Sequence, residues 1–170
     1  YTDMLPGVDL VVTATDTGFG EVFVVKNRAA AVNPALRRLA FGSQLSGLVW
    51  QADNGGLRAV DPATGEEVLA ASAPLMWDSG GDGTSDADGP GQGARVAPVA
   101  LSLSGSDVVL QPDTALLADA GTTFPMFIDP TLTYTAWTMI NREFPAQSYW
   151  SYDKNGCPSG YNTECAKVGH

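Results

Sequence analysis

Residues that could act as catalysts are few in this chain, and histidine is the scarcest of them. The only histidine is His170, the last residue. A serine or cysteine nucleophile needs a positioned base, which is usually a histidine. Lys26 and Lys167 lie in no Ser-x-x-Lys pattern, and the one such spacing, Ser151 to Lys154, lies among aromatic and turn residues that give it no recognisable catalytic context. We therefore expect no acyl-transfer site and predict that the chain is not an enzyme.

Four carboxylates beside predicted strands are the remaining candidates for acid–base chemistry: Asp9, Glu21, Asp78 and Asp129. A glycosidase-type pair needs only to lie about 5–10 Å apart in space, which a sequence does not reveal. However, an aspartate that flanks a strand usually caps a turn through its side chain. We expect structural roles for these residues and assign no catalytic residue.

An aspartate-rich segment is the most plausible metal site. Asp82, Asp86 and Asp88 alternate with small residues, as the oxygen ligands of a calcium loop do. The closing glutamate of such a loop is missing, and Arg95 stands near that end. Residues 79–93 contain no apolar side chain larger than alanine. A solvated, flexible linker is therefore the preferred interpretation, with calcium binding as the alternative. No other cofactor is predicted.

Both cysteines, Cys157 and Cys165, lie near the C-terminal end. Two cysteines cannot form a tetrahedral zinc site without two further soft ligands. Because the surrounding residues are typical of a loop, we predict a local disulfide, with two free thiols as the alternative. A disulfide would indicate an oxidising compartment.

Tryptophans fall into two groups. Trp50 and Trp77 stand in apolar strand candidates and are expected in the core. Trp137, Tyr149 and Trp150 follow the predicted module boundary. Their aromatic rings could stack on a sugar or on a partner protein, but packing between modules is the preferred interpretation.

Composition excludes several classes of function. The formal net charge is −10, and no basic cluster exceeds the pair Arg37-Arg38, so nucleic-acid binding is not expected. No apolar run approaches the length of a membrane span, so membrane insertion is not expected. Hydrophobic residues make up 44% of the chain and charged residues 16%, which is typical of a folded protein.

Short valine-rich and alternating segments, separated by Gly, Asp, Asn and Pro, predict strands that must position these residues. The first two should form a hairpin. A short helix is expected at Arg28–Val32, followed by one turn from Asn33 to Arg38, and a small turn at 114–120. The fold class is predicted as mainly β, with β-sandwich or barrel-like antiparallel sheets and one short helix. The strand candidates are residues 9–15, 21–26, 39–42, 48–52, 57–60, 67–70, 75–78, 96–103, 108–110 and 124–129.

Composition changes after Asp129-Pro130-Thr131, where aromatic and turn residues become dense. We therefore predict a β-rich extracellular module over residues 1–135. Residues 136–170 are expected to be the start of a following module or a C-terminal extension that carries the disulfide. Tyr1 in place of an initiator methionine suggests a piece of a longer protein.

Several short motifs resemble a known type of protein region. Leu5-Pro6-Gly7-Val8-Asp9-Leu10 opens the chain, and the segment from Phe124 to Thr131 closes its β-rich part. Residues 1–135 resemble the β-rich region upstream of LamG-like, Rhs-repeat or DNRLRE-type modules in large secreted actinobacterial proteins, of the cell-surface or polymorphic-toxin-like kind. The resemblance implies secretion, a cell-surface location and a scaffolding role, and it supplies no catalytic residues.

The expected function follows from these observations together. We predict a non-catalytic structural or interaction module of a large secreted or cell-surface bacterial protein, which spaces or presents neighbouring domains. Its expected partners are the adjacent domains of the parent chain, with other surface proteins or glycans as further candidates. A glycan- or calcium-binding module is the alternative.

Overall fold

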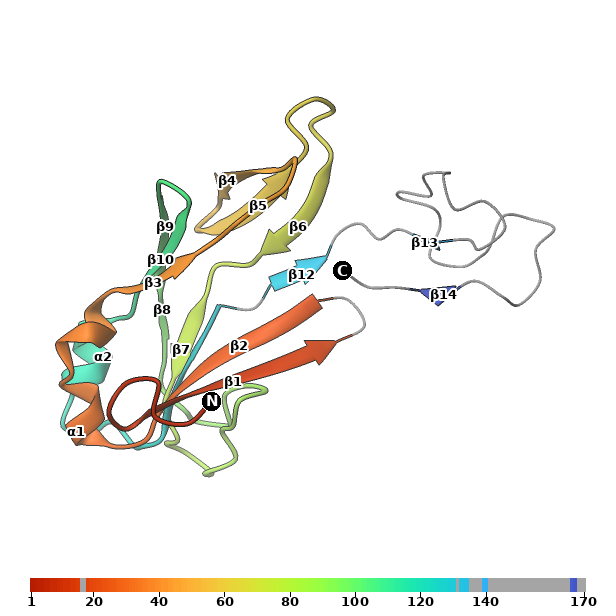
Figure 1. Cartoon of the computed structure of the whole chain (residues 1–170). Coiled ribbons are helices and arrows are strands. Elements are labelled where there is room, and N and C mark those ends of the chain that lie inside the picture. The colour runs from red at the N-terminus through yellow and green to blue at the C-terminus, as the bar shows by residue number, and fades with distance from the viewer. Residues whose placement is uncertain (16–17, 131, 135–138, 141–165, 168–170) are drawn as a thin grey trace.

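The computed structural model describes residues 1–15, 18–130, 132–134, 139–140 and 166–167. Within this part of the chain, three antiparallel sheets and two short α-helices are present (Figure 1). None of the helices described is long and apolar enough to cross a membrane.

The predicted N-terminal hairpin is confirmed. Strand β1 (Val8–Thr15) pairs with β2 (Gly18–Val25) along its whole length. Leu10 lies opposite Phe23, and both side chains are buried. Val8, Leu10, Phe23 and Val25 therefore form a buried apolar face at one end of the hairpin.

Strand β2 lies at the centre of the large sheet. One edge of β2 pairs with β1, and two strands share the opposite edge. β11 pairs with Phe23–Val25, whereas β12 pairs with Gly18 and Phe19. The sheet therefore forks at β2. Its remaining order is β4 (Val49–Asp53), β5 (Gly56–Val60), β6 (Glu67–Ala71), β12 (Leu132–Tyr134), β2, β11 (Met126–Asp129), β7 (Leu75–Trp77) and β8 (Val96–Pro98).

A second sheet has the order β3 (Leu39–Gly42), β10 (Asp107–Gln111) and β9 (Ala100–Ser104). The prediction of one strand over residues 96–103 is wrong, because the chain changes sheets at Val99. The backbone N–H of Val99 donates to the carbonyl of Pro74 at 2.9 Å, and its side chain is buried. Strands that switch sheets in this way form the corners of sandwich-like folds.

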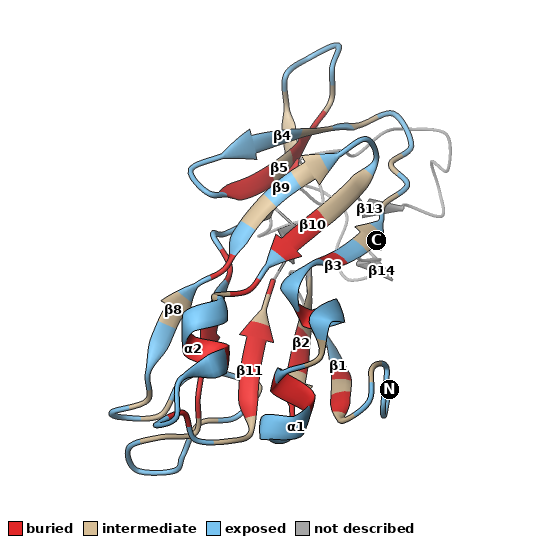
Figure 2. Ribbon diagram, turned by 90° about the vertical axis from the view of Figure 1, so that its left-hand side faces the viewer, coloured by how far each residue is buried: buried red, intermediate tan, exposed pale blue. Residues whose placement is uncertain are grey.

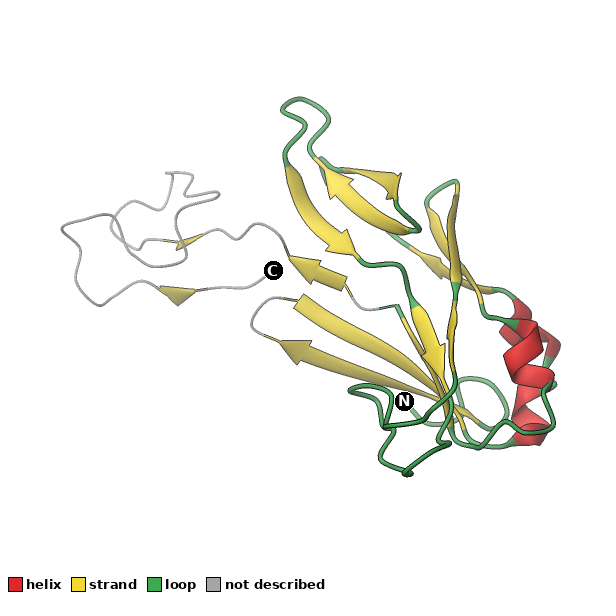
Figure 3. Ribbon diagram, turned by 180° about the vertical axis from the view of Figure 1, so that it is seen from behind, coloured by secondary structure: helices red, strands yellow, loops and turns green. Residues whose placement is uncertain are grey.

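The core lies between the two sheets and three short helical segments. Phe23 of the large sheet contacts Phe41 of the small sheet, with ring centroids 5.5 Å apart. Figure 2 shows buried residues on β2, β10, β11 and the helices, and further ones lie on β1, β3, β5, β6 and β7. The helices lie together on one side of the strands (Figure 3). They are α1 (Arg28–Ala31) and α2 (Thr114–Ala118), with a 3-10 turn, η1 (Pro34–Arg37), between β2 and β3.

Asparagine and aspartate caps explain why these helical turns form. Asn27 accepts a hydrogen bond from the N–H of Ala30 at 3.0 Å, and Asn33 accepts one from Ala35 at 3.0 Å. The predicted turn after Asn33 is therefore confirmed. The expectation of only one short helix is wrong, because residues 114–118 form a second α-helix capped by Asp113.

The prediction of a mainly β, antiparallel fold is confirmed, with the sandwich form and not the barrel. The described strands form open sheets, and β4 and β8 end the order of the large one. Beyond residue 135 the structure describes one pair, β13 (Met139–Ile140) with β14 (Ala166–Lys167). The proposed division of the chain at residue 135 stays a prediction.

Candidate functional site

Asp78 is a structural carboxylate. It follows β7 and is only 1% exposed. Its carboxylate accepts hydrogen bonds from the backbone N–H groups of Gly80 (3.0 Å), Arg95 (2.9 Å) and Thr123 (3.1 Å). Burial raises the pKa of Asp78, but these hydrogen bonds and the nearby Arg95 charge outweigh burial, so the pKa lies below its usual value. The predicted turn-capping role is confirmed for this residue.

Asp9 belongs to a surface ion pair. Its carboxylate lies 2.7 Å from the ammonium of Lys26 and accepts a hydrogen bond from the N–H of Asp3 at 2.8 Å. The hydrogen bond from Lys26 holds the pKa of Asp9 below its usual value. Asp129 ends β11 opposite Leu75 and is also engaged in a contact. The partners of Asp9 are those expected of a structural residue.

The aspartate-rich segment folds over the outer face of the large sheet. Its two ends meet where the backbone N–H of Asp78 donates to the carbonyl of Arg95 at 3.1 Å. In its middle, the carbonyl of Asp86 accepts a hydrogen bond from the indole N–H of Trp77 at 3.1 Å. Ala87 packs on the small apolar cluster around Trp77. The segment is therefore a covering loop, and its interpretation as a linker is wrong.

Two carboxylates of the predicted calcium site are turned towards nearby groups of their own loop. Asp82 accepts hydrogen bonds from the backbone N–H and the hydroxyl of Thr84, which lower its pKa. Asp86 accepts one from the N–H of Asp88 at 2.9 Å. Among the described residues, no three His, Cys, Asp or Glu side chains are grouped closely enough to hold a metal ion. Calcium binding stays a prediction without geometric support.

The two tryptophans expected in the core differ. Trp77 is 2% exposed and stacks on Phe127, with ring centroids 5.7 Å apart. Trp50 is only half-buried, so the prediction is wrong for this residue. The reason is that Trp50 lies on β4, which ends the strand order of the large sheet. Its indole N–H donates to the hydroxyl of Ser43 at 2.8 Å.

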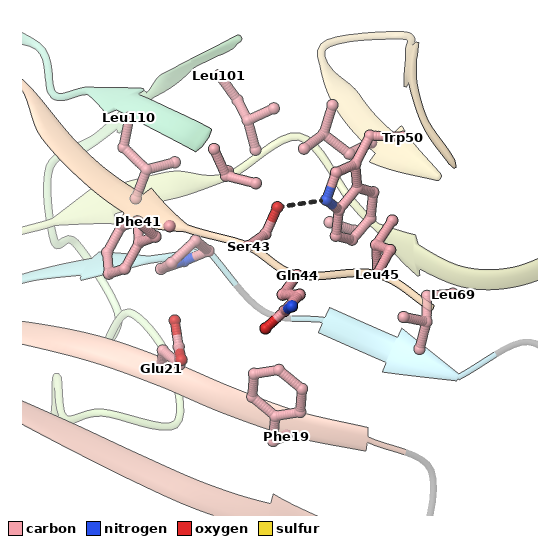
Figure 4. Close-up of a pocket in the computed structure, with 15 residues that line it drawn as sticks. Phe19, Glu21, Phe41, Ser43, Gln44, Leu45, Trp50, Leu69, Leu101 and Leu110 are labelled. Carbon is pink, nitrogen blue, oxygen red and sulfur yellow. Dashed lines mark hydrogen bonds between the residues drawn. The ribbon is translucent and has the colours of Figure 1, made fainter. Parts of the chain in front are cut away.

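Trp50 lines a pocket of about 270 Å³ between the two sheets. Figure 4 shows residues of β2, β3 and the segment after β3 around this space. Leu110 and Phe41 line the pocket and also pack in the main core, so the pocket continues the core outward. Most of the lining is apolar: Phe19, Phe41, Leu45, Trp50, Leu57, Leu69, Ala71, Leu101, Val108, Leu110 and Pro130.

Glu21 is the exception in this lining. It lies inside β2, where it shares an inward-facing row with Phe19 and Phe23 because alternate residues of a strand face the same side. Burial raises the pKa of the Glu21 carboxyl above its usual value. The expectation that Glu21 caps a turn is therefore wrong. Its place in the valine-rich β2 was the only sequence signal of this environment.

An apolar pocket with one acidic group can bind a ligand and hold it in one orientation. Sequence reasoning missed the pocket because its walls come from strands far apart along the chain, and Ser43 and Gln44 carried no recognisable pattern. The predicted disulfide, Cys157 and Cys165, lies outside the described residues. So do the predicted contact residues Trp137, Tyr149 and Trp150.

Comparisons of this chain with protein-family models, with curated proteins and with solved structures find no match.

Proposed function

We propose that residues 1–135 form a non-catalytic structural module that spaces or presents neighbouring domains of a larger protein. The observation that carries this proposal is the use of Asp78. This carboxylate is buried, and its oxygens accept three backbone N–H groups from separate parts of the chain. A carboxylate held in this way stabilises the framework and is not available as an acid or a base.

Other polar side chains also bind the backbone. Arg28 donates to the carbonyls of Asp119, Ala120 and Thr122 at 3.1–3.2 Å, and its guanidinium lies 5.3 Å from the centre of the Phe124 ring. The hydroxyl of Thr122 donates to the carbonyl of Leu116 at 2.6 Å. These bonds connect segments across the fold, as is expected of a rigid spacer.

The proposed setting is the outside of a bacterial cell. The resemblance of residues 1–135 to regions of large secreted actinobacterial proteins supports secretion, and the predicted disulfide at Cys157 and Cys165 agrees with it. The proposed partners are the adjacent domains of the parent chain. A free-thiol assay after purification without reductant tests the disulfide, and two reactive thiols would contradict it.

Rigidity is the testable property of a spacer. We would replace both native cysteines by serine and place spin labels at Val32 and Ala63, which are exposed. Val32 follows α1, and Ala63 lies in the turn between β5 and β6. The proposal predicts one narrow distance distribution that does not change when a folded domain is fused after His170. A broad distribution would count against it.

The non-catalytic part of the proposal has its own test. Hydrolysis of a glycan or peptide that is lost in Asp9→Asn or Asp129→Asn would overturn it. The alternative of a glycan- or calcium-binding module stays a prediction. A glycan array and a calcium-dependent rise in melting temperature are the measurements that test it.

A further inference from the structure

Glu21 occupies a position where an acid costs stability. Its neighbours in the inward-facing row of β2 are aromatic, and its partner on β1 is Val12. Transfer of a charged group from water into apolar surroundings is unfavourable unless the group is paired. The inward face of a strand is therefore the wrong place for an unpaired glutamate if packing alone is considered.

No such pairing is found within the described residues. Neither a hydrogen bond nor an ion pair to the Glu21 carboxylate is formed by any of them, and burial is the cause of its pKa shift. Glu21 is also the only ionisable residue among the 15 that line the pocket. The negative charge of the pocket thus lacks a described counter-charge.

The other polar groups of the pocket are already engaged or lie at its edge. The Ser43 hydroxyl accepts from Trp50 and donates to the carbonyl of Ser106. Gln44 is exposed, and its amide extends into the space shown in Figure 4. A ligand would therefore meet apolar walls, one carboxylate and one amide.

We propose that this pocket binds a small amphiphilic amine, with its aryl or alkyl body between the two sheets and its protonated nitrogen paired with Glu21. Charge complementarity argues for a cation, because a charge-assisted hydrogen bond to a cation offsets part of the cost of burying the carboxylate. The volume of about 270 Å³ is at the small end for a ligand pocket and suits a compact molecule. This inference does not depend on the structural role proposed above.

The ligand class is distinct from the sugar and calcium alternatives. A sugar carries many hydroxyl groups, and the apolar walls of the pocket would leave most of them without hydrogen bonds. Calcium takes six or more oxygen ligands, whereas the pocket offers the carboxylate of Glu21 as its only charged one. One cationic nitrogen on an apolar body matches the pocket better than either.

The test uses the full chain and two probes of nearly the same shape, phenethylamine and phenethyl alcohol. Two-dimensional NMR titration would follow the indole N–H signal of Trp50, which lines the pocket. We expect the amine to bind about tenfold more tightly than the alcohol, as a charge-assisted hydrogen bond predicts. In Glu21→Gln, the amine should lose about tenfold in affinity while the alcohol binds unchanged.

Two further variants complete the test. Asp88→Asn removes the same charge from the exposed loop and should bind both probes as the parent chain does. Leu69→Trp fills the pocket from β6 and should weaken both probes, with thermal unfolding used to show that it is folded. The proposal is overturned if neither probe binds, if Glu21→Gln retains the amine preference, or if Leu69→Trp binds both probes normally.

Discussion

Two carboxylates of this protein lie in opposite environments. Asp78 is fully buried but surrounded by N–H donors, so its pKa lies below the usual value. Glu21 faces an apolar pocket, and burial raises its pKa. The first stabilises the folded state as a carboxylate, whereas the second destabilises it when ionised. The two residues therefore give separate experimental signatures.

Removal of the Asp78 charge should destabilise the fold. We expect Asp78→Asn to lower the free energy of unfolding by about 2–3 kcal/mol, because hydrogen bonds to a buried charged group are replaced by weaker ones. In addition, the NH₂ group of asparagine would face a backbone N–H that now donates to a carboxylate oxygen. Urea unfolding at neutral pH measures this. Asp88→Asn, which lies on the same loop but is exposed, should change the value by less than about 0.5 kcal/mol.

The pH dependence of the Asp78 effect has a definite sign. Because the folded-state pKa is lowered, the stabilisation is fully present above the unfolded value of about 3.9. It is lost as the pH falls through the folded-state pKa. The difference between the parent chain and Asp78→Asn should therefore shrink below about pH 4. A difference that stays constant down to acid unfolding would contradict the assignment.

Glu21 should behave in the opposite way. Its folded-state pKa is raised, so its ionisation costs stability as the pH rises above the unfolded value of about 4.3. We expect Glu21→Gln to be more stable than the parent chain at neutral pH by about 1 kcal/mol, and the gain to vanish in acid. Urea unfolding from acid to neutral pH tests this, and a less stable variant at neutral pH would refute it.

At the scale of elements, the loop between β7 and β8 depends on close backbone contact. Gly81 has a φ of +76°, and the N–H of Asp82 donates to the carbonyl of Gln92 at 3.0 Å. A Cβ atom at Gly81 would overlap the Gln92 carbonyl. The loop therefore needs glycine both for its conformation and for its packing.

This loop offers a matched pair of substitutions. Gly83 has a similar φ of +72°, but a Cβ atom there would meet no atom within 4 Å. Gly83→Ala should cost about 1 kcal/mol, from backbone strain alone. Gly81→Ala should lower the free energy of unfolding by about 3 kcal/mol, because the loop segments around Gly81 and Gln92 must also move apart. Equal effects in urea unfolding would show that the two sides of the loop are not in contact.

At the scale of the whole molecule, β12 joins two halves of the large sheet. In the described strand order it stands between β6 and β2, where Leu132 lies opposite both Ala71 and Phe19. Pro130, just before this strand, is buried and lines the pocket. The pocket thus lies where the sheet forks between β11 and β12.

Truncation tests how much the pairing of β12 with β6 and β2 stabilises the fold. We expect a chain of residues 1–135 to keep the melting temperature of the full chain, because it retains β12. A chain of residues 1–130 loses β12 and should melt roughly 4–8 °C lower, which corresponds to about 2 kcal/mol for a domain of this size. Circular dichroism measures both. Melting of the 1–135 chain well below the full chain would place the module boundary elsewhere.

Local chemistry determined much of this fold from the sequence alone. The hairpin of β1 and β2 follows from two valine-rich segments around a short turn. The turn between β4 and β5 follows from Asn54-Gly55, where both residues have positive φ angles. Asn33-Pro34 likewise determines η1. These features could be predicted because the residues that cause them are neighbours in the chain.

Only the tertiary structure decided which residues meet across the two sheets. The alternation of residues 96–103 does not reveal that the chain changes sheets at Val99. Similarly, nothing near Glu21 in the sequence shows that it lines one pocket together with Phe41, Trp50 and Leu101. Burial and pKa depend on non-local contacts, so the candidate site emerged from the folded chain and not from any motif.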